Sequence, residues 1–155
     1  MSVGVGVVWA VGRNGGYGAI FPTPWSSFYG HMAVVCNGET GSDGETFTEG
    51  AKALNLGPVI GERTWGGWVG IRSDKPLADR GMVTLPEFPG WSIDGKWLIE
   101  GWGSEPDIKI VEEPGSIMAG KDPQLDYTIE YLLKKIAEEP RVYPDHPVYP
   151  NRSIR

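Results

Sequence analysis

Apolar and polar positions along the chain alternate in short blocks, and the blocks predict a series of strands with two helices among them. The first strand is expected at residues 3–10, although its glycines weaken it. Two further apolar runs, at 32–36 and 59–60, have the length of buried strands. Later strands are expected at the end of the 63–70 loop and at 81–88, 96–100 and 106–111. Mixed with two helices, these strands indicate an α/β domain.

The first helix is expected at about 43–55. Phe47, Ala51 and Leu54 fall at positions i, i+4 and i+7, which is the spacing of an amphipathic helix. Gly57 lies just past its end, where a glycine commonly stops a helix.

The second helix carries the clearest signals in the chain. Asp122 is a good N-cap, Pro123 takes the first helical position and Pro140 ends the helix. Between them runs an apolar stripe composed of Leu125, Ile129, Leu132, Leu133 and Ile136. The Pro- and Tyr-rich segment that follows, 140–155, is expected to be extended.

A compact turn joins the strand at 32–36 to the first helix. Ser42 stands in it between Gly41 and Gly44. A sharp turn there would expose the hydroxyl and aim the first free N–H groups of the helix at the same place, as a nucleophile and an oxyanion site require. The alternative is an ordinary turn with Ser42 or Asp43 as N-cap. Spacing alone favours this alternative, because small residues are common at such turns.

Composition narrows the class of protein. The chain has 155 residues, which suits one domain, and its 23 Gly and 13 Pro predict many turns. Its net charge is −6 without a basic cluster, which argues against nucleic acid and against an anionic membrane surface. Cys36 is the only cysteine, so an internal disulfide is ruled out, and we expect it to pack as a small apolar residue.

The sequence shows neither a membrane-spanning stretch nor the features of a signal peptide at its start. We therefore expect a cytoplasmic protein. The periplasm stays open, because Met1 need not be the native start.

Several motifs, in a fixed order, resemble one known family. Gly41-Ser42-Asp43-Gly44-Glu45, preceded by Asn37, is similar to the nucleophile motif of the tricorn branch of the tail-specific serine proteases. Matching segments follow at 54–67, 86–88, 100–108 and 120–125, and the resemblance runs from about Trp9 to the C-terminus.

The resemblance implies an α/β fold that is the second half of a ClpP/crotonase-like superhelix of β-β-α units, with a mixed sheet and two main helices. Residues 1–139 would be a partial tricorn-type protease core, and residues 140–155 a Pro-rich tail.

The same resemblance assigns roles to three residues. Ser42 would be the nucleophile, and the backbone N–H of Asp43 would donate to the oxyanion. Glu100 falls where the tricorn class keeps a glutamate that supports a histidine through a hydroxyl. The alternative for Glu100 is an exposed acid at the end of a strand. We expect neither a cofactor nor a metal.

A base for Ser42 is not recognisable. The chain contains only His31 and His146, and neither matches the family histidine. His31 starts the strand that ends near Ser42, which would separate them by on the order of 30 Å. In the Ser–Lys class of tail-specific proteases a lysine serves as base, but Gly67 occupies that position here.

Two other features of the sequence have alternative interpretations. The Asn-Gly-Gly sequence within 13–16 is not equated with the family's oxyanion motif, because it lies too close to Ser42 in sequence, and a hairpin turn is favoured. Trp65 and Trp68 would either line the cleft or pack in the core.

The expected function is therefore the nucleophile-bearing core of a serine peptidase that hydrolyses peptides through an acyl-enzyme. Peptides or proteins would be its substrates. Because no base is recognisable, we expect the chain to form a homo-oligomer or to associate with a missing N-terminal half. Two alternatives stay open: a self-standing acyl hydrolase or esterase, and a catalytically silent peptide-binding fragment.

Overall fold

The computed structural model describes residues 28–142, 148 and 150. All of its helices and strands lie in one compact unit, His31–Glu138. The expected strand at 3–10, the turn at 13–16, His146 and most of the tail lie outside the described residues. Within the described part, none of the helices has the length and apolar character needed to cross a membrane.

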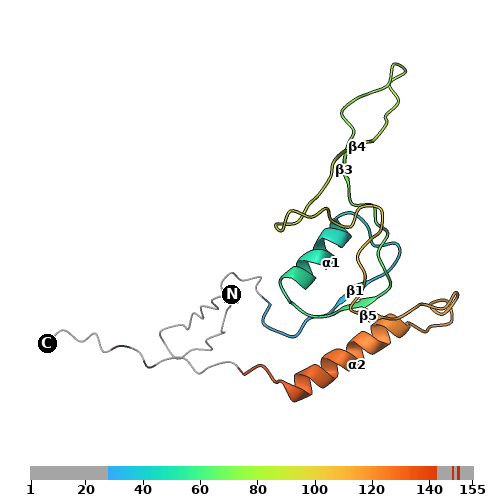
Figure 1. The fold of residues 1–155 in the computed structure, drawn as a ribbon. Helices are drawn as coiled ribbons and strands as arrows, with labels where there is room; N and C mark the ends of the chain where they lie inside the picture. The colour runs from blue at the N-terminus through green and yellow to red at the C-terminus, as the bar shows by residue number, and fades with distance from the viewer. Residues whose placement is uncertain (1–27, 143–147, 149, 151–155) are drawn as a thin grey trace. The chain divides into compact units, whose positions relative to one another are not determined.

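Three short parallel strands form the main sheet. They are β1 (Val34–Cys36), β2 (Val59–Gly61) and β5 (Ile108–Lys109), in the order β1-β2-β5. The central strand β2 is buried at all three positions, as its continuous apolar run predicts. Helices α1 (Asp43–Ala53) and α2 (Pro123–Glu138) lie on opposite sides of this sheet (Figure 1).

The apolar core lies between β1, β2 and α1. Val34, Cys36 and Val59 form one buried cluster with Ala51 of α1. The Cys36 thiol donates to the Glu62 carbonyl at 3.2 Å, and burial raises the pKa of this thiol. The neutral thiol is therefore favoured by folding, and this stabilisation is lost as the pH rises through the raised pKa. Cys36 thus packs as the sequence predicts.

Helix α1 begins where predicted but buries a different face. It ends at Ala53, and Phe47 and Leu54 are 56% and 66% exposed, so of the expected apolar stripe only Ala51 is buried. The buried side chains of α1 are Glu45, Thr48 and Ala51, because this helix packs against polar loops as well as the sheet.

Helix α2 is capped as predicted and packs in an unexpected way. The carboxylate of Asp122 accepts the Leu125 N–H at 2.8 Å. The side chains of α2 that are buried are Gln124 and Thr128, both polar. Four residues of the apolar stripe, Leu125, Ile129, Leu133 and Ile136, are 47–62% exposed. An apolar stripe normally faces the core. In the described part of the chain, this helix instead exposes its apolar side to solvent.

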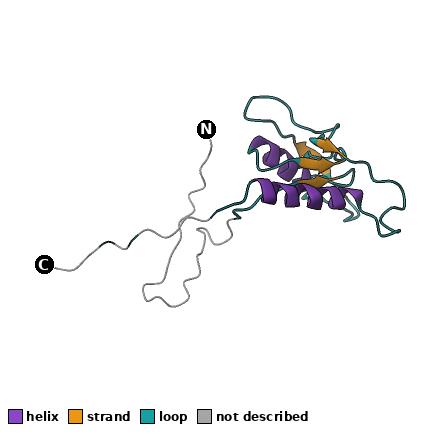
Figure 2. Ribbon diagram, turned by 90° about the horizontal axis from the view of Figure 1, so that it is seen from below, coloured by secondary structure: helices purple, strands orange, loops and turns teal. Residues whose placement is uncertain are grey.

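The remaining strands form a separate sheet, so the expectation of one mixed sheet is wrong. Strand β3 (Gly70–Arg72) pairs antiparallel with β4 (Leu85–Phe88), and the hairpin projects away from the helices (Figure 1). Strand β4 is shorter than the expected 81–88. The strand expected at 96–100 is absent. The pairing in this region is a single isolated bridge between Trp91 and Trp97. Loops account for much of the described chain (Figure 2).

Candidate active site

Ser42 occupies a strained position at the junction of a strand and a helix. It follows β1, precedes the first residue of α1, and is exposed to solvent. Its backbone has φ 50° and ψ −115°, in the left-handed half of φ space that residues other than glycine rarely adopt. Such a conformation costs about 1–3 kcal/mol and persists only where the surroundings enforce it. The predicted sharp turn is therefore present.

The two glycines near Ser42 lie close to neighbouring side chains. A Cβ atom on Gly41 would lie 2.7 Å from Cε3 of Trp65, and one on Gly44 would lie 2.9 Å from Cγ2 of Thr40. The indole of Trp65 thus rests against the turn, and 67% of this residue is exposed. An exposed aromatic ring beside Ser42 fits the interpretation that Trp65 lines a cleft.

The backbone N–H groups around Ser42 differ in whether they have an acceptor. The Ser42 N–H donates to the Gly67 carbonyl at 3.2 Å and to Oε2 of Glu45 at 3.1 Å. The Gly44 N–H donates to the Gly41 carbonyl. The N–H of Asp43, the first residue of α1, has no acceptor among the described residues. A free N–H at the start of a helix favours negative charge.

The Glu45 carboxylate is a buried feature that sequence reasoning did not assign to the site. Glu45 is 0% exposed. Its Oε1 accepts the Thr64 hydroxyl at 2.6 Å and the Gly66 N–H at 2.7 Å, while its Oε2 faces Ser42. The available signal was the capping-box spacing, with a serine followed three residues later by a glutamate.

Further polar groups extend from Thr64 along the buried face of α1. The Ser104 N–H donates to Oγ1 of Thr64 at 2.7 Å, and the Ser104 hydroxyl donates to Glu49. Nζ of Lys52 donates to Oγ of Ser104 at 3.0 Å and pairs with Glu49 at 3.2 Å. The loops around residues 64 and 104 are therefore joined to α1 by hydrogen bonds.

Glu100 lies in a turn and is half-buried, so it is not a solvated acid at the end of a strand. Its Oε2 accepts the N–H groups of Trp68 and Val69 at 2.5 and 2.6 Å. Its Oε1 has no partner among the described residues. Trp68 follows Gly67, whose carbonyl accepts the Ser42 N–H, so the structure brings Glu100 to the loop that contacts Ser42.

The structure places His31 on the far side of β1 from Ser42 along the chain. His31 precedes Val34, the first residue of the strand, whereas Ser42 follows the last. Trp68, the other tryptophan considered for the cleft, donates its indole N–H to Thr46 at 2.5 Å and lies against Gly90. It is therefore more enclosed than Trp65.

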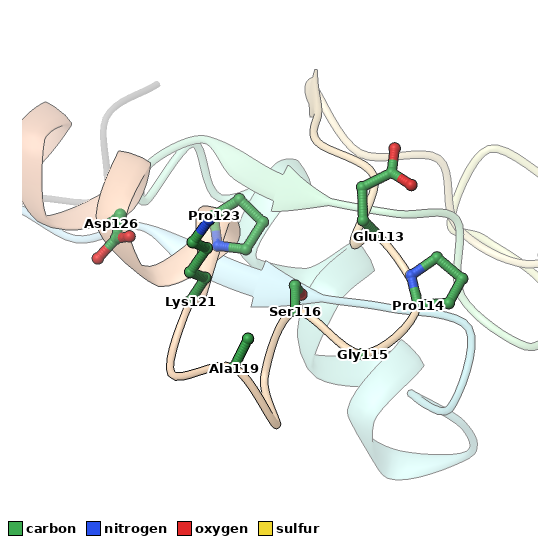
Figure 3. A pocket seen from close by; sticks show the side chains of 8 residues that line it. All are labelled: Glu113, Pro114, Gly115, Ser116, Ala119, Lys121, Pro123 and Asp126. Atoms are coloured by element: carbon green, nitrogen blue, oxygen red, sulfur yellow. The ribbon is translucent and has the colours of Figure 1, made fainter.

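A pocket lies elsewhere in the unit, between the 113–121 loop and the start of α2 (Figure 3). Its volume is about 530 Å³. Oγ of Ser116, in its wall, is buried without a hydrogen-bond partner among the described residues. None of the lining residues belongs to the Ser42 turn or to the loops that contact it.

The fold and this geometry define an α/β protein that presents a serine on a strained strand-to-helix turn beside a free helix N–H. The sequence pattern of Peptidase family S41 matches residues 8–110. The chain belongs to this family of serine peptidases.

Known relatives agree with this assignment. The chain is 38% identical over 130 residues to the tricorn protease of Thermoplasma acidophilum, a match that covers 84% of this chain and 12% of that protein. It is 39% identical over 115 residues to tricorn protease homolog 1 of Streptomyces coelicolor, covering 74% and 11% of the two chains. A crystal structure of the tricorn protease is similar, with a TM-score of 0.75 at 37% identity, and the match covers 84% of this chain and 12% of that one. The chain therefore spans about one eighth of the length of these relatives.

Proposed function

We propose that the chain supplies the nucleophile of a tricorn-type serine peptidase and that this nucleophile is Ser42. The observation that carries the proposal is the exposed, left-handed Ser42 at the start of α1. A turn of this kind exposes the serine side chain to a substrate.

The proposed reaction is acyl transfer in two stages. Oγ of Ser42 attacks the carbonyl carbon of a peptide bond while a base takes the hydroxyl proton. The negative oxygen that forms is stabilised by the free N–H of Asp43. The amine leaves with a proton, and water then hydrolyses the ester on Ser42.

Glu100 has the supporting role in this proposal. Its Oε2 is fixed by two backbone N–H groups, which leaves Oε1 for a hydroxyl that would orient the base. A carboxylate held in this way stabilises the positive charge that develops on a histidine as it takes the proton.

The base itself would come from another polypeptide or from another part of a longer protein. The structure of the tricorn protease, of which the match covers 12%, supports this view. We propose further that the fold of this unit is the second half of a ClpP/crotonase-like superhelix. The exposed apolar stripe of α2 is one surface that such an association would cover.

Labelling with a fluorophosphonate tests the proposal on the full chain. We expect weak labelling alone and faster labelling with added imidazole, which supplies a base in solution. The reaction should disappear in Ser42→Ala and persist in the control Ser116→Ala, since Ser116 lines a pocket that does not include Ser42. Labelling that survives Ser42→Ala would refute the nucleophile assignment. Strong labelling without imidazole would mean that the chain contains its own base, as the esterase alternative requires.

A further inference from the structure

One buried carboxylate links the Ser42 turn to the loop that faces it. Oε2 of Glu45 accepts the Ser42 N–H, and Oε1 accepts the Gly66 N–H and the Thr64 hydroxyl. The adjacent Gly67 carbonyl closes the arrangement by accepting the Ser42 N–H as well. Ser42 and the 64–67 loop are therefore held at a fixed distance by the same side chain.

The chemistry of the contacts calls for a carboxylate rather than an amide. All three groups that meet Glu45 are donors, and an ionised carboxylate offers acceptors only. A glutamine could keep its oxygen toward Thr64 and Gly66, but its NH₂ group would then face the Ser42 N–H. The loss would fall on the contact to Ser42, where the backbone is strained.

We infer that Glu45 is a positioning residue for Ser42. Its carboxylate holds Ser42 in the left-handed conformation, and this fixes the direction of the hydroxyl relative to the free Asp43 N–H. The inference rests on the proposed function, because it assigns Glu45 a part in the same acyl transfer. The reactivity of Ser42 then depends on a residue that no substrate touches, since Glu45 is fully buried.

Glu49 provides a matched control. It lies one turn further along α1, and it belongs to the same polar network through Ser104. Its carboxylate contacts Ser104 and Lys52, and among the described residues it has no hydrogen bond to Ser42 or Gly66. Glu45→Gln and Glu49→Gln therefore make the same chemical change in the same network, and only the first reaches Ser42.

The first measurement is the rate of fluorophosphonate labelling of the full chain with imidazole, corrected for the folded fraction. We expect Glu45→Gln to slow labelling by about tenfold or more, as the loss of a positioning contact does, and Glu49→Gln to change it by less than about threefold. Equal rates in Glu45→Gln and the unmodified chain would overturn the inference. If labelling does not depend on Ser42 at all, the proposed function fails, and this result is separate from the Glu45 comparison.

The second measurement does not depend on the chemical reactivity of Ser42. In amide hydrogen exchange, we expect Glu45→Gln to increase the exchange rates of Ser42 and Gly66 by about tenfold or more, while β2 stays as protected as in the unmodified chain. A purely structural role would instead raise exchange throughout the unit, and that result would overturn the inference.

A milder pair of variants covers the case in which Glu45→Gln does not fold. Thr64→Val removes one donor to Oε1 of Glu45, whereas Thr64→Ser keeps the hydroxyl. We expect Thr64→Val to slow labelling and Thr64→Ser to leave it within about twofold of the unmodified chain. Identical rates in the two variants would count against the role of Glu45.

Discussion

At the scale of single residues, the strain at Ser42 is tolerated because its N–H group has two acceptors. The Gly67 carbonyl and the Glu45 carboxylate both accept from it. One acceptor belongs to a loop and the other to α1, so the conformation depends on both elements being in place. This explains why a serine, rather than a glycine, can remain at a positive φ here.

The proposed role of Glu100 can be tested by a single substitution. In an active assembly, Glu100→Gln should reduce turnover by one to two orders of magnitude, or about 1.4–2.7 kcal/mol, because the swap keeps the shape and removes the charge. A glutamine oxygen can still accept from Trp68 and Val69, so the free energy of unfolding should change by less than about 1 kcal/mol. Peptide hydrolysis and thermal unfolding measure the two effects.

The matched control for this experiment is Glu87→Gln, on the exposed strand β4, where the carboxylate pairs with Arg72. It should leave turnover unchanged. Unchanged turnover in Glu100→Gln as well would mean that Glu100 holds the 68–69 backbone without a part in the reaction.

At the scale of elements, the two helices differ in what they bury. Helix α1 buries the carboxylate of Glu45, which bonds to the 64–67 loop, and Thr48, which donates to the Gly44 carbonyl of the same helix. Helix α2 buries Gln124 and Thr128 against the sheet. The amide of Gln124 donates to the Ile110 carbonyl at 3.1 Å. Polar contacts thus attach both helices to their surroundings, α1 through Glu45 and α2 through Gln124.

The cap of α2 can be tested directly. Asp122→Ala removes the acceptor of the Leu125 N–H and should lower the free energy of unfolding by about 0.5–2 kcal/mol. Thermal unfolding followed by circular dichroism measures the loss. Lys121→Ala, at the exposed neighbouring position, is the control and should change stability by less than about 0.5 kcal/mol. Equal melting temperatures for the two variants would contradict the assignment of Asp122 as the cap.

At the scale of the whole molecule, the unit leaves a large amount of apolar surface exposed. The α2 stripe contributes Leu125, Ile129, Leu133 and Ile136, and the β3–β4 hairpin adds exposed Ile71 and Phe88. A run of exposed apolar residues along one face of a helix, as in the α2 stripe, is typical of a site of association. This agrees with a chain that spans about one eighth of the length of its relatives.

We therefore expect the chain alone to self-associate as its concentration rises. Sedimentation velocity should show a growing fraction of dimer or larger species, and Leu133→Lys should reduce that fraction by placing a charge in the stripe. Glu138→Lys, on the other side of the same helix, should leave it unchanged. A clean monomer at high concentration would count against this prediction.

The sequence by itself determined the features that depend on neighbours along the chain. The cap of α2, the buried strand β2 and the sharp turn at Ser42 all follow from residues within a few positions of one another. The motif around Ser42 also indicated the family, because its residues are contiguous. Local propensity and turn chemistry are sufficient for such features.

Only the tertiary structure decided which polar groups are buried together. In the sequence, Glu45 has the pattern of an ordinary acidic residue in the first turn of a helix. It becomes part of the site because the loop at 64–67 folds over it. Glu100 likewise obtains its partners from residues more than thirty positions away. The exposure of the α2 stripe could not be predicted from its sequence either. A periodic pattern identifies the apolar face of a helix but does not show what covers that face. Burial is a property of the contacts between distant segments, and these contacts fix where the charges of the site can lie.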